Sequence, residues 1–397
     1  MAQSLSALTG AGMRVYDKVV HPQVFSKNVL YMNILRNVAH QIGATTKYIS
    51  VWYGRNVGSA AGSETLTLPT AGNQQYLQGS IPMKYLFHQI SITDVALQAS
   101  KKSKEFLVNL LENEYNGAKN DMQRQMSRMG YGIGTGELCL LNGDPGTSGT
   151  TLTFDTPMVG KNPTDYMDVG NIIRLGSTAS QIYTIATITG NTTATCDAVA
   201  AGVADNDSVY IAQSATQSNK DYEIMGLKGL IDDSTNVDSL EGIARSTYIW
   251  WKSYVDDAST QRSLSEDLMH STFLEAKKKG DPKYALTSFD VMKAYGQLLA
   301  ADRRYGTEMK LEGGFTGVGF NGIPLVADFD CPYDEMYFID PSTLSVEDLA
   351  PISFLEEDGS ILDRSSTTPA WNATLKYYSN LAISAPNKNS ALRDVIK

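Results

Sequence analysis

Apolar residues recur at helical spacing in the segment that follows residue 93. Seven positions, separated by steps of three or four residues, form one continuous stripe: Leu107, Leu111, Tyr115, Ala118, Met122, Met126 and Met129. This spacing is close to the 3.6-residue period of a helix, so it predicts one long helix with a buried face and a wet face. We expect the helix to begin near Thr93-Asp94, to run for about 37 residues and to end at the glycine-rich turn that starts at Gly130.

A polar segment bounded by glycine, residues 54–90, directly precedes this helix. It passes through Glu64 to a tip of small and polar residues at 71–75, and it returns through 81–87. A two-stranded arm with so few apolar residues at its tip cannot bury enough of its own surface to be stable in water. We therefore expect the arm to bind a partner outside its own domain, most simply a second copy of the same chain.

The remaining patterns mix helices and strands. Residues 1–25 are typical of an extended arm, and the apolar spacing at 26–41 predicts a short amphipathic helix. Two further helices are expected at 261–279 and 288–303, the second capped by Thr287. Because no βαβ alternation links these elements, the expected fold class is α+β. Strands are expected at 47–53, 319–328 (a hairpin), 335–338, 344–346 and 371–383.

Residues 145–216 differ in composition from the rest of the chain. They are rich in Thr, Ser, Ala, Gly and Asp, and they contain almost no Lys or Arg. Short alternating runs separated by turn signals such as Thr189-Gly190-Asn191 predict strands. We expect a small β-barrel or sandwich inserted after the long helix. The expected strands are 151–154, 171–175, 181–188, 192–196 and 208–211.

The charge balance argues against a dedicated reader of nucleic acid. The chain has 33 basic and 43 acidic residues, a formal net charge of −10, and no basic cluster that would grip phosphates. An acidic shell that encloses nucleic acid without sequence-specific binding is compatible with this balance. Cys139, Cys196 and Cys331 are widely spaced, so we expect three reduced thiols. We expect neither a secretory signal nor a membrane span, which would need about 18 consecutive apolar residues.

The sequence patterns favour no enzyme, metal or cofactor site. The histidines are isolated, residues 313–322 lack the lysine of a phosphate loop, and no Gly-x-Ser-x-Gly occurs. Acidic residues do gather at Asp328, Asp330, Asp334 and Glu335, and again at 356–358. Such groups could bind Ca²⁺ or Mg²⁺, or act as the carboxylate pair of a glycosidase. Because the EF-hand pattern is missing, we expect solvated loops or cross-subunit ion pairs instead, with no catalytic residues, metals or cofactors.

The order of these elements resembles the major capsid proteins of tailed bacteriophages, which share the Hong Kong 97-like fold. The correspondence covers most of the chain. Residues 319–328, Gly-Phe-Asn-Gly-Ile-Pro-Leu-Val-Ala-Asp, followed by 336–344, Met-Tyr-Phe-Ile-Asp-Pro-Ser-Thr-Leu, are similar to the family's "G-x-P-v-x-D … f-x-d-x-x-t-l" stretch. The ending, where 371–375 leads into 379–383, is similar as well.

The resemblance implies a division of the chain and a set of interface residues. Residues 54–90 would be the E-loop, which lies across a neighbouring subunit. E-loop interface residues would be Arg55, Glu64, Leu66, Leu68, Gln74, Tyr76 and Lys84; in the A-domain, Arg303 and Arg304 would pair with acidic groups on a neighbour. The full division is 1–53 for the N-terminal arm, short helix and first P-domain strand, 54–90 for the E-loop, 91–144 for the P-domain spine helix, 145–216 for the inserted β domain, 217–334 for the A-domain, and 335–397 for the P-domain return.

The resemblance further implies a structural, non-enzymatic head protein. Copies would self-assemble into hexamers and pentamers of an icosahedral shell in the virion, built in the host cytoplasm. Expected partners are other copies of the chain, a separate scaffolding protein, a portal, in some relatives a decoration protein, and enclosed double-stranded DNA; no membrane is expected. Two alternatives stay open: a hydrolytic enzyme with a carboxylate site at 328–358, and a tail or adhesion protein that binds through 145–216.

Overall fold

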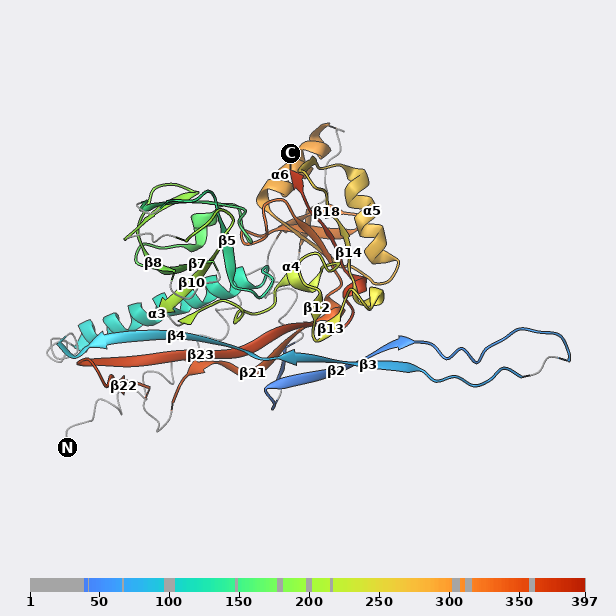
Figure 1. Ribbon diagram of the computed structural model, residues 1–397, viewed down its shortest axis with the longest axis horizontal. Coiled ribbons are helices and arrows are strands. Elements are labelled where there is room, and N and C mark those ends of the chain that lie inside the picture. The colour runs from blue at the N-terminus through green and yellow to red at the C-terminus, as the bar shows by residue number, and fades with distance from the viewer. Residues whose placement is uncertain are drawn as a thin grey trace.

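The computed structural model describes residues 39–41, 43–65, 68–95, 104–146, 149–176, 181–197, 202–214, 217–301, 308–310, 316–356 and 361–396. Four parts are visible in Figure 1: a long sheet with a helix along it, a β-barrel above the helix, a mixed domain around a second sheet, and a hairpin that projects far from the rest. Helices and strands are mixed and most strand pairs of the described residues are antiparallel, so the fold class is α+β, as expected.

The long sheet is built on β23 (Ala370–Ile383). Strand β4 (Lys84–Thr93) pairs antiparallel with one edge of β23, while β21 (Leu344–Phe354) and the short β22 (Asp363–Arg364) pair with the other. This confirms the expected final strand at 371–383 and extends the strand expected at 344–346.

Strand β1 (Ala39–Gln41) lies at the margin of the same sheet, parallel to β21. The helix expected at 26–41 is therefore wrong for residues 39–41, and residues 26–38 lie outside the described residues. The physical reason is long-range: the backbone of Ala39–Gln41 pairs with Val346–Asp348, and this pairing outweighs local helical spacing.

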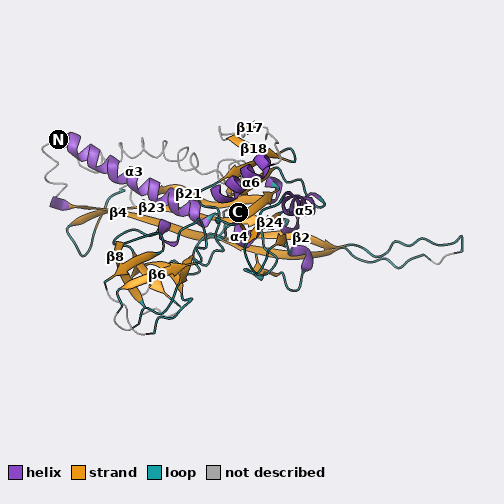
Figure 2. Ribbon diagram, turned by 90° about the horizontal axis from the view of Figure 1, so that it is seen from above, coloured by secondary structure: helices purple, strands orange, loops and turns teal. Residues whose placement is uncertain are grey.

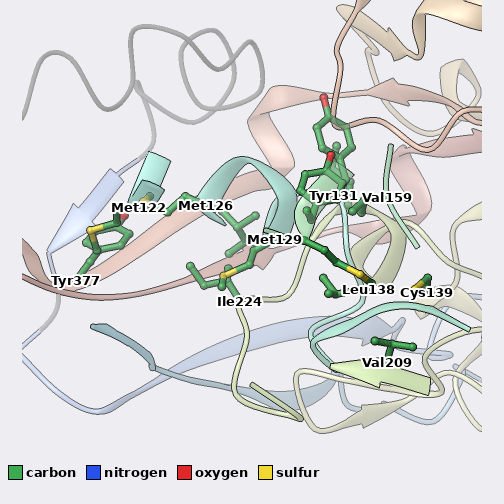
Figure 3. Packing of buried hydrophobic residues seen from close by; sticks show 14 of the residues in the cluster. Met122, Met126, Met129, Tyr131, Leu138, Cys139, Val159, Val209, Ile224 and Tyr377 are labelled. Carbon is green, nitrogen blue, oxygen red and sulfur yellow. The ribbon is translucent and has the colours of Figure 1, made fainter. Parts of the chain in front are cut away.

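Helix α3 (Lys104–Met129) packs on the long sheet and carries the expected stripe. Tyr115, Ala118, Met122, Met126 and Met129 are all buried, and the ring of Tyr115 lies 5.7 Å from that of Phe354. Helical residues begin at Asp94, directly after β4, and α3 ends at Met129, as expected. Residues 96–103 and the side chains of Leu107 and Leu111 lie outside the described part. Figure 3 shows how the methionines continue into a core shared with the barrel.

Six antiparallel strands close the barrel. Around it the order is β5, β6, β9, β8, β7, β10 and back to β5, and β11 (Gln217–Ser218) extends β10. The expected strands at 151–211 are confirmed. The barrel nevertheless starts earlier than residue 145, because Asp144-Pro145-Gly146 is a connection between two of its strands. The bounds are β5 (Glu137–Leu141), β6 (Thr151–Asp155), η3 (Pro163–Tyr166), β7 (Ile172–Leu175), β8 (Ile182–Ile188), β9 (Thr193–Cys196) and β10 (Ser208–Ser214).

The second sheet has seven strands and two helices packed on it. Its order is β14, β24, β20, β16, β19, β18, β17. The expected hairpin at 319–328 is confirmed: Asn321 and Gly322, both with positive φ, form its tight turn. The bounds are β14 (Tyr254–Asp256), α5 (Glu266–Lys277), β16 (Tyr284–Thr287), α6 (Phe289–Ala301), β17 (Glu308–Lys310), β18 (Thr316–Phe320), β19 (Ile323–Ala327), β20 (Met336–Ile339) and β24 (Ser390–Leu392).

The helix expected at 288–303 is α6, but its cap is not Thr287. Thr287 is the last residue of β16, and its hydroxyl donates to the carbonyl of Glu335. Ser288 is the capping residue, because its Oγ accepts the N–H of Val291 at 3.2 Å. The expectation was wrong by one residue, because Thr287 belongs to strand β16 and pairs there with Ala327 and Met336.

Short elements connect the two sheets. The most important is the tight hairpin of β12 (Ser239–Leu240) and β13 (Ile243–Ala244), which touches both the long sheet and the projecting hairpin. Other short elements of the described chain are α4 (Leu227–Leu230), η4 (Ile249–Trp251), β15 (Arg262–Ser263), η5 (Pro341–Thr343), η6 (Pro386–Lys388) and β25 (Val395–Ile396).

Candidate assembly interface

The projecting hairpin is the most exposed part of the described chain. Strands β2 (Thr46–Gly54) and β3 (Gln75–Pro82) pair antiparallel with Trp52 opposite Tyr76, and the connection between them extends well beyond the body (Figures 1 and 2). Strand β2 confirms the strand expected at 47–53. The hairpin differs from the expected excursion at 54–90, because it begins at Thr46 and ends at Pro82, while Lys84–Thr93 belongs to the long sheet.

The two faces of the hairpin have opposite characters, because side chains alternate along a strand. On one face Ile49, Val51 and Leu77 pack against the body. On the other face Tyr48, Trp52 and Tyr76 are 64%, 60% and 65% exposed. Trp and Tyr anchor many protein interfaces, since each buries a large rigid surface at low entropic cost. We call these three residues the aromatic face.

The connection between the strands is held in shape by its own polar groups. Asn56 Oδ1 accepts N–H groups from Gly58 at 2.7 Å and Gly72 at 2.9 Å, which ties the two arms of the connection together. Trp52 Nε1 donates to Gln74 Oε1 at 2.8 Å. All hydrogen bonds found for the described residues between 55 and 74 stay within the hairpin. These bonds hold the two arms of the connection together where it leaves the strands. No hydrogen bond found for its described residues reaches the body.

The base of the hairpin is anchored to the body through polar groups. Ser80 N–H donates to the carbonyl of Glu241 at 2.7 Å, and Asn380 Nδ2 donates to the carbonyl of Pro82 at 2.8 Å. Lys47 Nζ pairs with Glu347 on β21 at 2.5 Å. Gly79 is buried at this point, and a Cβ there would approach Ile49 to 2.9 Å, so glycine permits the close contact.

Aromatic stacking adds to the anchor. The ring of Tyr53 stacks on Trp250 with centroids 5.3 Å apart and an interplanar angle of 8°, and it meets Tyr248 edge-on at 5.8 Å. Stacked aromatic pairs add about 1 kcal/mol beyond their buried area. These contacts hold the hairpin at one angle while leaving the aromatic face open.

Most of the expected E-loop residues lie on this hairpin. Arg55, Glu64, Leu68, Gln74 and Tyr76 are all exposed there, while Leu66, Arg303 and Arg304 lie outside the described residues. The expectation missed Tyr48 and Trp52, although the alternation at 47–53 could have indicated their shared face.

Lys84 is not on the hairpin. It lies on β4, its Nζ donates to the carbonyl of Asp221 at 2.7 Å, and burial lowers its pKa against the raising effect of Asp221 and Glu223. Residues 84–87 could not be assigned to the sheet from local pattern, because their partner strand β23 lies almost 300 positions away in sequence.

In the acidic cluster at 328–335, Asp328, Asp330 and Glu335 are buried and Asp334 is half-buried, which corrects the expectation of solvated loops or cross-subunit pairs. Tyr131 Oη donates to Asp328 at 2.8 Å, and Tyr166 and Ser127 donate to Asp330. Glu335 pairs with Lys228 at 2.8 Å. Burial, and then the neighbouring charge of Asp330, raises the pKa of Asp328 to about 6.

These carboxylates join parts of the fold. Tyr166 belongs to the barrel, Ser127 to α3, and Asp330 to the loop after β19, so one carboxylate connects three parts. Of the second acidic group, Glu356 is exposed, and 357–358 lie outside the described residues. Among the described residues no three His, Cys, Asp or Glu side chains are placed to hold a metal ion. No described helix has the length and hydropathy needed to cross a membrane.

Comparison with known proteins gives a likeness in structure alone. No protein-family model and no curated protein matches the chain. The capsid protein of cyanophage A-1(L) has a TM-score of 0.54 and 13% identity, and the match covers 93% of each chain. A solved structure from Mycobacterium phage Bobi matches with a TM-score of 0.46 and 9% identity, over 93% of this chain and 91% of the other. The chain therefore has the Hong Kong 97-like fold of tailed-bacteriophage capsid proteins.

Proposed function

We propose that this chain is the major capsid protein of a tailed bacteriophage. It is a structural subunit that self-assembles into hexamers and pentamers of an icosahedral shell around the genome. The single observation that carries the proposal is the hairpin, whose aromatic face is open and whose connection lies beyond the body. The fold shared with the cyanophage A-1(L) capsid protein supports the same function.

The hairpin gives assembly a simple physical basis. Each copy donates one hairpin and receives one from a neighbour, so the contacts are heterologous and close into rings or a lattice. Individual contacts need only modest affinity, because many of them reinforce one another once the shell is closed.

The proposal extends to partners and location. The chain is assembled with a separate scaffolding protein in the host cytoplasm and ends in the virion, together with a portal and, where one exists, a decoration protein on the barrel. The formal charge of −10 supports enclosure of double-stranded DNA without sequence-specific contacts.

The two alternatives receive less support. A hydrolytic site would need carboxylates free to meet a substrate, whereas Asp328 and Asp330 are buried and accept hydrogen bonds from Tyr131, Tyr166 and Ser127. A tail or adhesion protein acting through the barrel would be a monomer or small oligomer. Sedimentation of the chain expressed together with its scaffolding protein separates these cases, because a shell protein then forms megadalton particles.

Deleting the hairpin connection tests the proposal directly. Gly58 and Gly72 both donate to Asn56, so residues 59–71 can be removed and the two glycines joined with little strain. We expect this variant to keep the wild-type melting temperature, because the deleted part has no support from the body, and to form no complete shells in electron micrographs. A Gly/Ser segment of equal length is the matched control for loop length. Normal particles from the deletion variant would contradict the proposal.

A further inference from the structure

A single turn connects the hairpin base to the long sheet. Glu241 and Gly242 form the turn between β12 and β13, with φ of 54° and 79°. The carbonyl of Glu241 accepts the N–H of Ser80 on β3 at 2.7 Å, and its side-chain Oε1 accepts the N–H of Ile383 on β23 at 2.8 Å. One residue therefore bridges the hairpin and the sheet.

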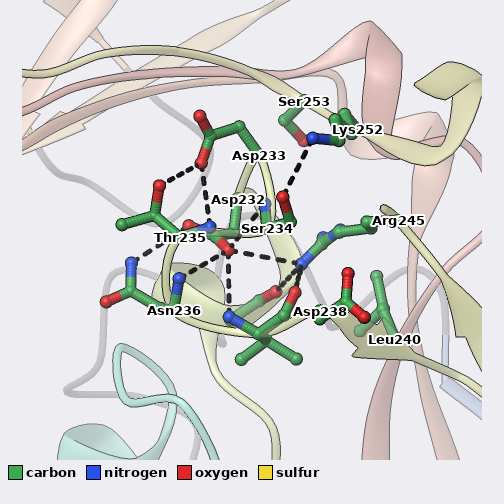
Figure 4. Close-up of polar contacts among 12 residues, drawn as sticks. Asp232, Asp233, Ser234, Thr235, Asn236, Asp238, Leu240, Arg245, Lys252 and Ser253 are labelled. Atoms are coloured by element: carbon green, nitrogen blue, oxygen red, sulfur yellow. Dashed lines mark hydrogen bonds and ion pairs between the residues drawn. The ribbon is translucent and has the colours of Figure 1, made fainter. Parts of the chain in front are cut away.

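Buried polar contacts within the body hold the β12–β13 turn in place. Arg245 directly follows β13, is fully buried, and donates to the carbonyls of Gly229, Leu230 and Val237. Asp232 lies 3.7 Å from Arg245 and accepts three backbone N–H groups of its own loop, as Figure 4 shows. The β12–β13 turn is therefore held in place. Any change of angle where the hairpin meets the turn, which we call the joint, is a movement of the hairpin.

The carboxyl group of Glu241 is in an unusual position for a charge. Glu241 as a whole is half-buried, but its second oxygen, Oε2, is buried and has no hydrogen-bond partner among the described residues. The charge of a second carboxylate, Glu347 on β21, acts on it, and the nearby cations are engaged elsewhere: Lys47 pairs with Glu347, and Arg245 with Asp232 and the carbonyls. Further from Glu241, the charges of Asp233 and Arg393 act on Arg245.

We propose that Glu241 is a proton-sensitive anchor that sets whether the hairpin is held at a fixed angle. When its carboxyl is neutral, the joint stays closed and the hairpin is immobile. When the carboxyl is ionised, a buried charge beside Glu347 destabilises the joint, and opening lets water solvate it. This inference rests on the proposed function, because the part that moves is the assembly surface.

The direction of the pH effect follows from the environment of Glu241. Burial, and with it the charge of Glu347, raises the pKa of Glu241 from 4.5 to about 8 in the closed joint, against the lowering effects of Ile383 N–H, Arg245 and Lys47. In the open joint the group is solvated and returns toward its ordinary value. The closed state is therefore favoured most below pH 4.5, and this contribution is lost as the pH rises to about 8.

Distance measurements on the unassembled full-length chain test the anchor. Spin labels at Gln78→Cys on β3 and Ser271→Cys on α5 occupy exposed positions, whereas the native cysteines are buried. Double electron–electron resonance should show a narrow distance distribution at pH 5 that broadens toward pH 9, with at least a tenfold fall in the ratio of closed to open molecules. An unchanged wild-type distribution from pH 5 to pH 9 overturns the proposal, whatever the variants do.

Two variants and a matched control define the residue responsible. Glu241→Gln keeps the bond to Ile383 without a titratable proton, so its distribution should stay narrow at every pH. Glu347→Gln removes the negative charge that raises the pKa of Glu241 and should weaken the pH response. Glu64→Gln, the same change at an exposed position of the hairpin, should behave as wild type. A full pH response in Glu241→Gln would refute the assignment.

The outcome is separable from the proposed function. If the distance distribution does not change with pH while the deletion of 59–71 abolishes shells, the proposal for Glu241 is wrong and the capsid function stands. If the anchor titrates but the wild-type chain forms no particles even when co-expressed with its scaffolding protein, the capsid function is wrong.

Discussion

At the scale of single residues, the hairpin carries apolar side chains on both faces, and only one face is covered. Ile49, Val51 and Leu77 are covered by the body, whereas Tyr48, Trp52 and Tyr76 remain in water. Leaving a large aromatic side chain exposed forgoes roughly 2 kcal/mol of burial free energy. A second copy of the chain recovers that free energy, so the aromatic face contributes to assembly and little to the stability of one subunit.

Truncating the aromatic face should separate these two properties. We expect Trp52→Ala with Tyr76→Ala to change the free energy of unfolding by less than about 1 kcal/mol, because both side chains are mostly exposed. The same variant should raise the protein concentration needed for assembly at least tenfold, since each lost anchor costs about 1–2 kcal/mol per contact. Light scattering against concentration measures this.

The control for this pair is Tyr222→Ala, because Tyr222 is 71% exposed but lies off the hairpin. It should assemble as wild type. Equal losses in the two variants would show that exposed aromatics in general, and not the hairpin face, drive association.

At the scale of elements, the barrel is fixed to the body by buried polar bonds as well as by a shared core. Tyr166 donates to Asp330 from the barrel side, and the backbones of Gly160 and Asp330 are also bonded at 3.2 Å. The barrel and α3 share the core that contains Met126, Met129 and Leu138. Such a joint orients the barrel rather than letting it move as a separate domain.

Removing one hydroxyl should loosen that joint. Tyr166→Phe leaves a buried oxygen of Asp330 without one of its donors, so we expect a loss of about 1–3 kcal/mol in the free energy of unfolding. Urea unfolding gives the loss, and hydrogen exchange of η3 should increase. Tyr222→Phe, which removes an exposed hydroxyl, should have no effect. A wild-type urea midpoint for Tyr166→Phe would show that the bond to Asp330 does not stabilise the contact between the barrel and the body.

At the scale of the whole molecule, the end of the chain stabilises its middle. Arg393, next to β24, pairs with Asp232 at 3.0 Å and lies 3.8 Å from Glu335, and it donates to the carbonyls of Lys228 and Ile231. The second sheet likewise places β24 between β14 and β20. The mixed domain is therefore complete only when the last strands have joined it.

Removing that arginine should destabilise the whole domain. Arg393→Met leaves Asp232 and Glu335 buried with one fewer cation, and breaking a buried ion pair in this way costs roughly 3 kcal/mol. Arg364→Met, at an exposed position of β22, is the matched control. Chemical denaturation compares the two, and equal midpoints would mean that the arginine does not stabilise the domain.

Local pattern was enough for several features that depend on neighbouring residues. The stripe of α3, the short strands of the barrel and the Asn321-Gly322 turn follow from spacing and turn chemistry. The scarcity of apolar residues at the tip, 71–75, likewise predicted an arm without support from its own body.

Tertiary structure alone decided the features that depend on distant residues. Ala39–Gln41 became a strand through β21, Lys84–Thr93 joined the long sheet through β23, and β5 joined the barrel through β10. Charged side chains are rarely buried unless they are paired, so Asp328 and Asp330 were expected in water, whereas the fold places the hydroxyls of Tyr131 and Tyr166 against them. For the same reason Glu241 showed no pattern in the sequence: its surroundings come from strands more than 100 positions away on either side.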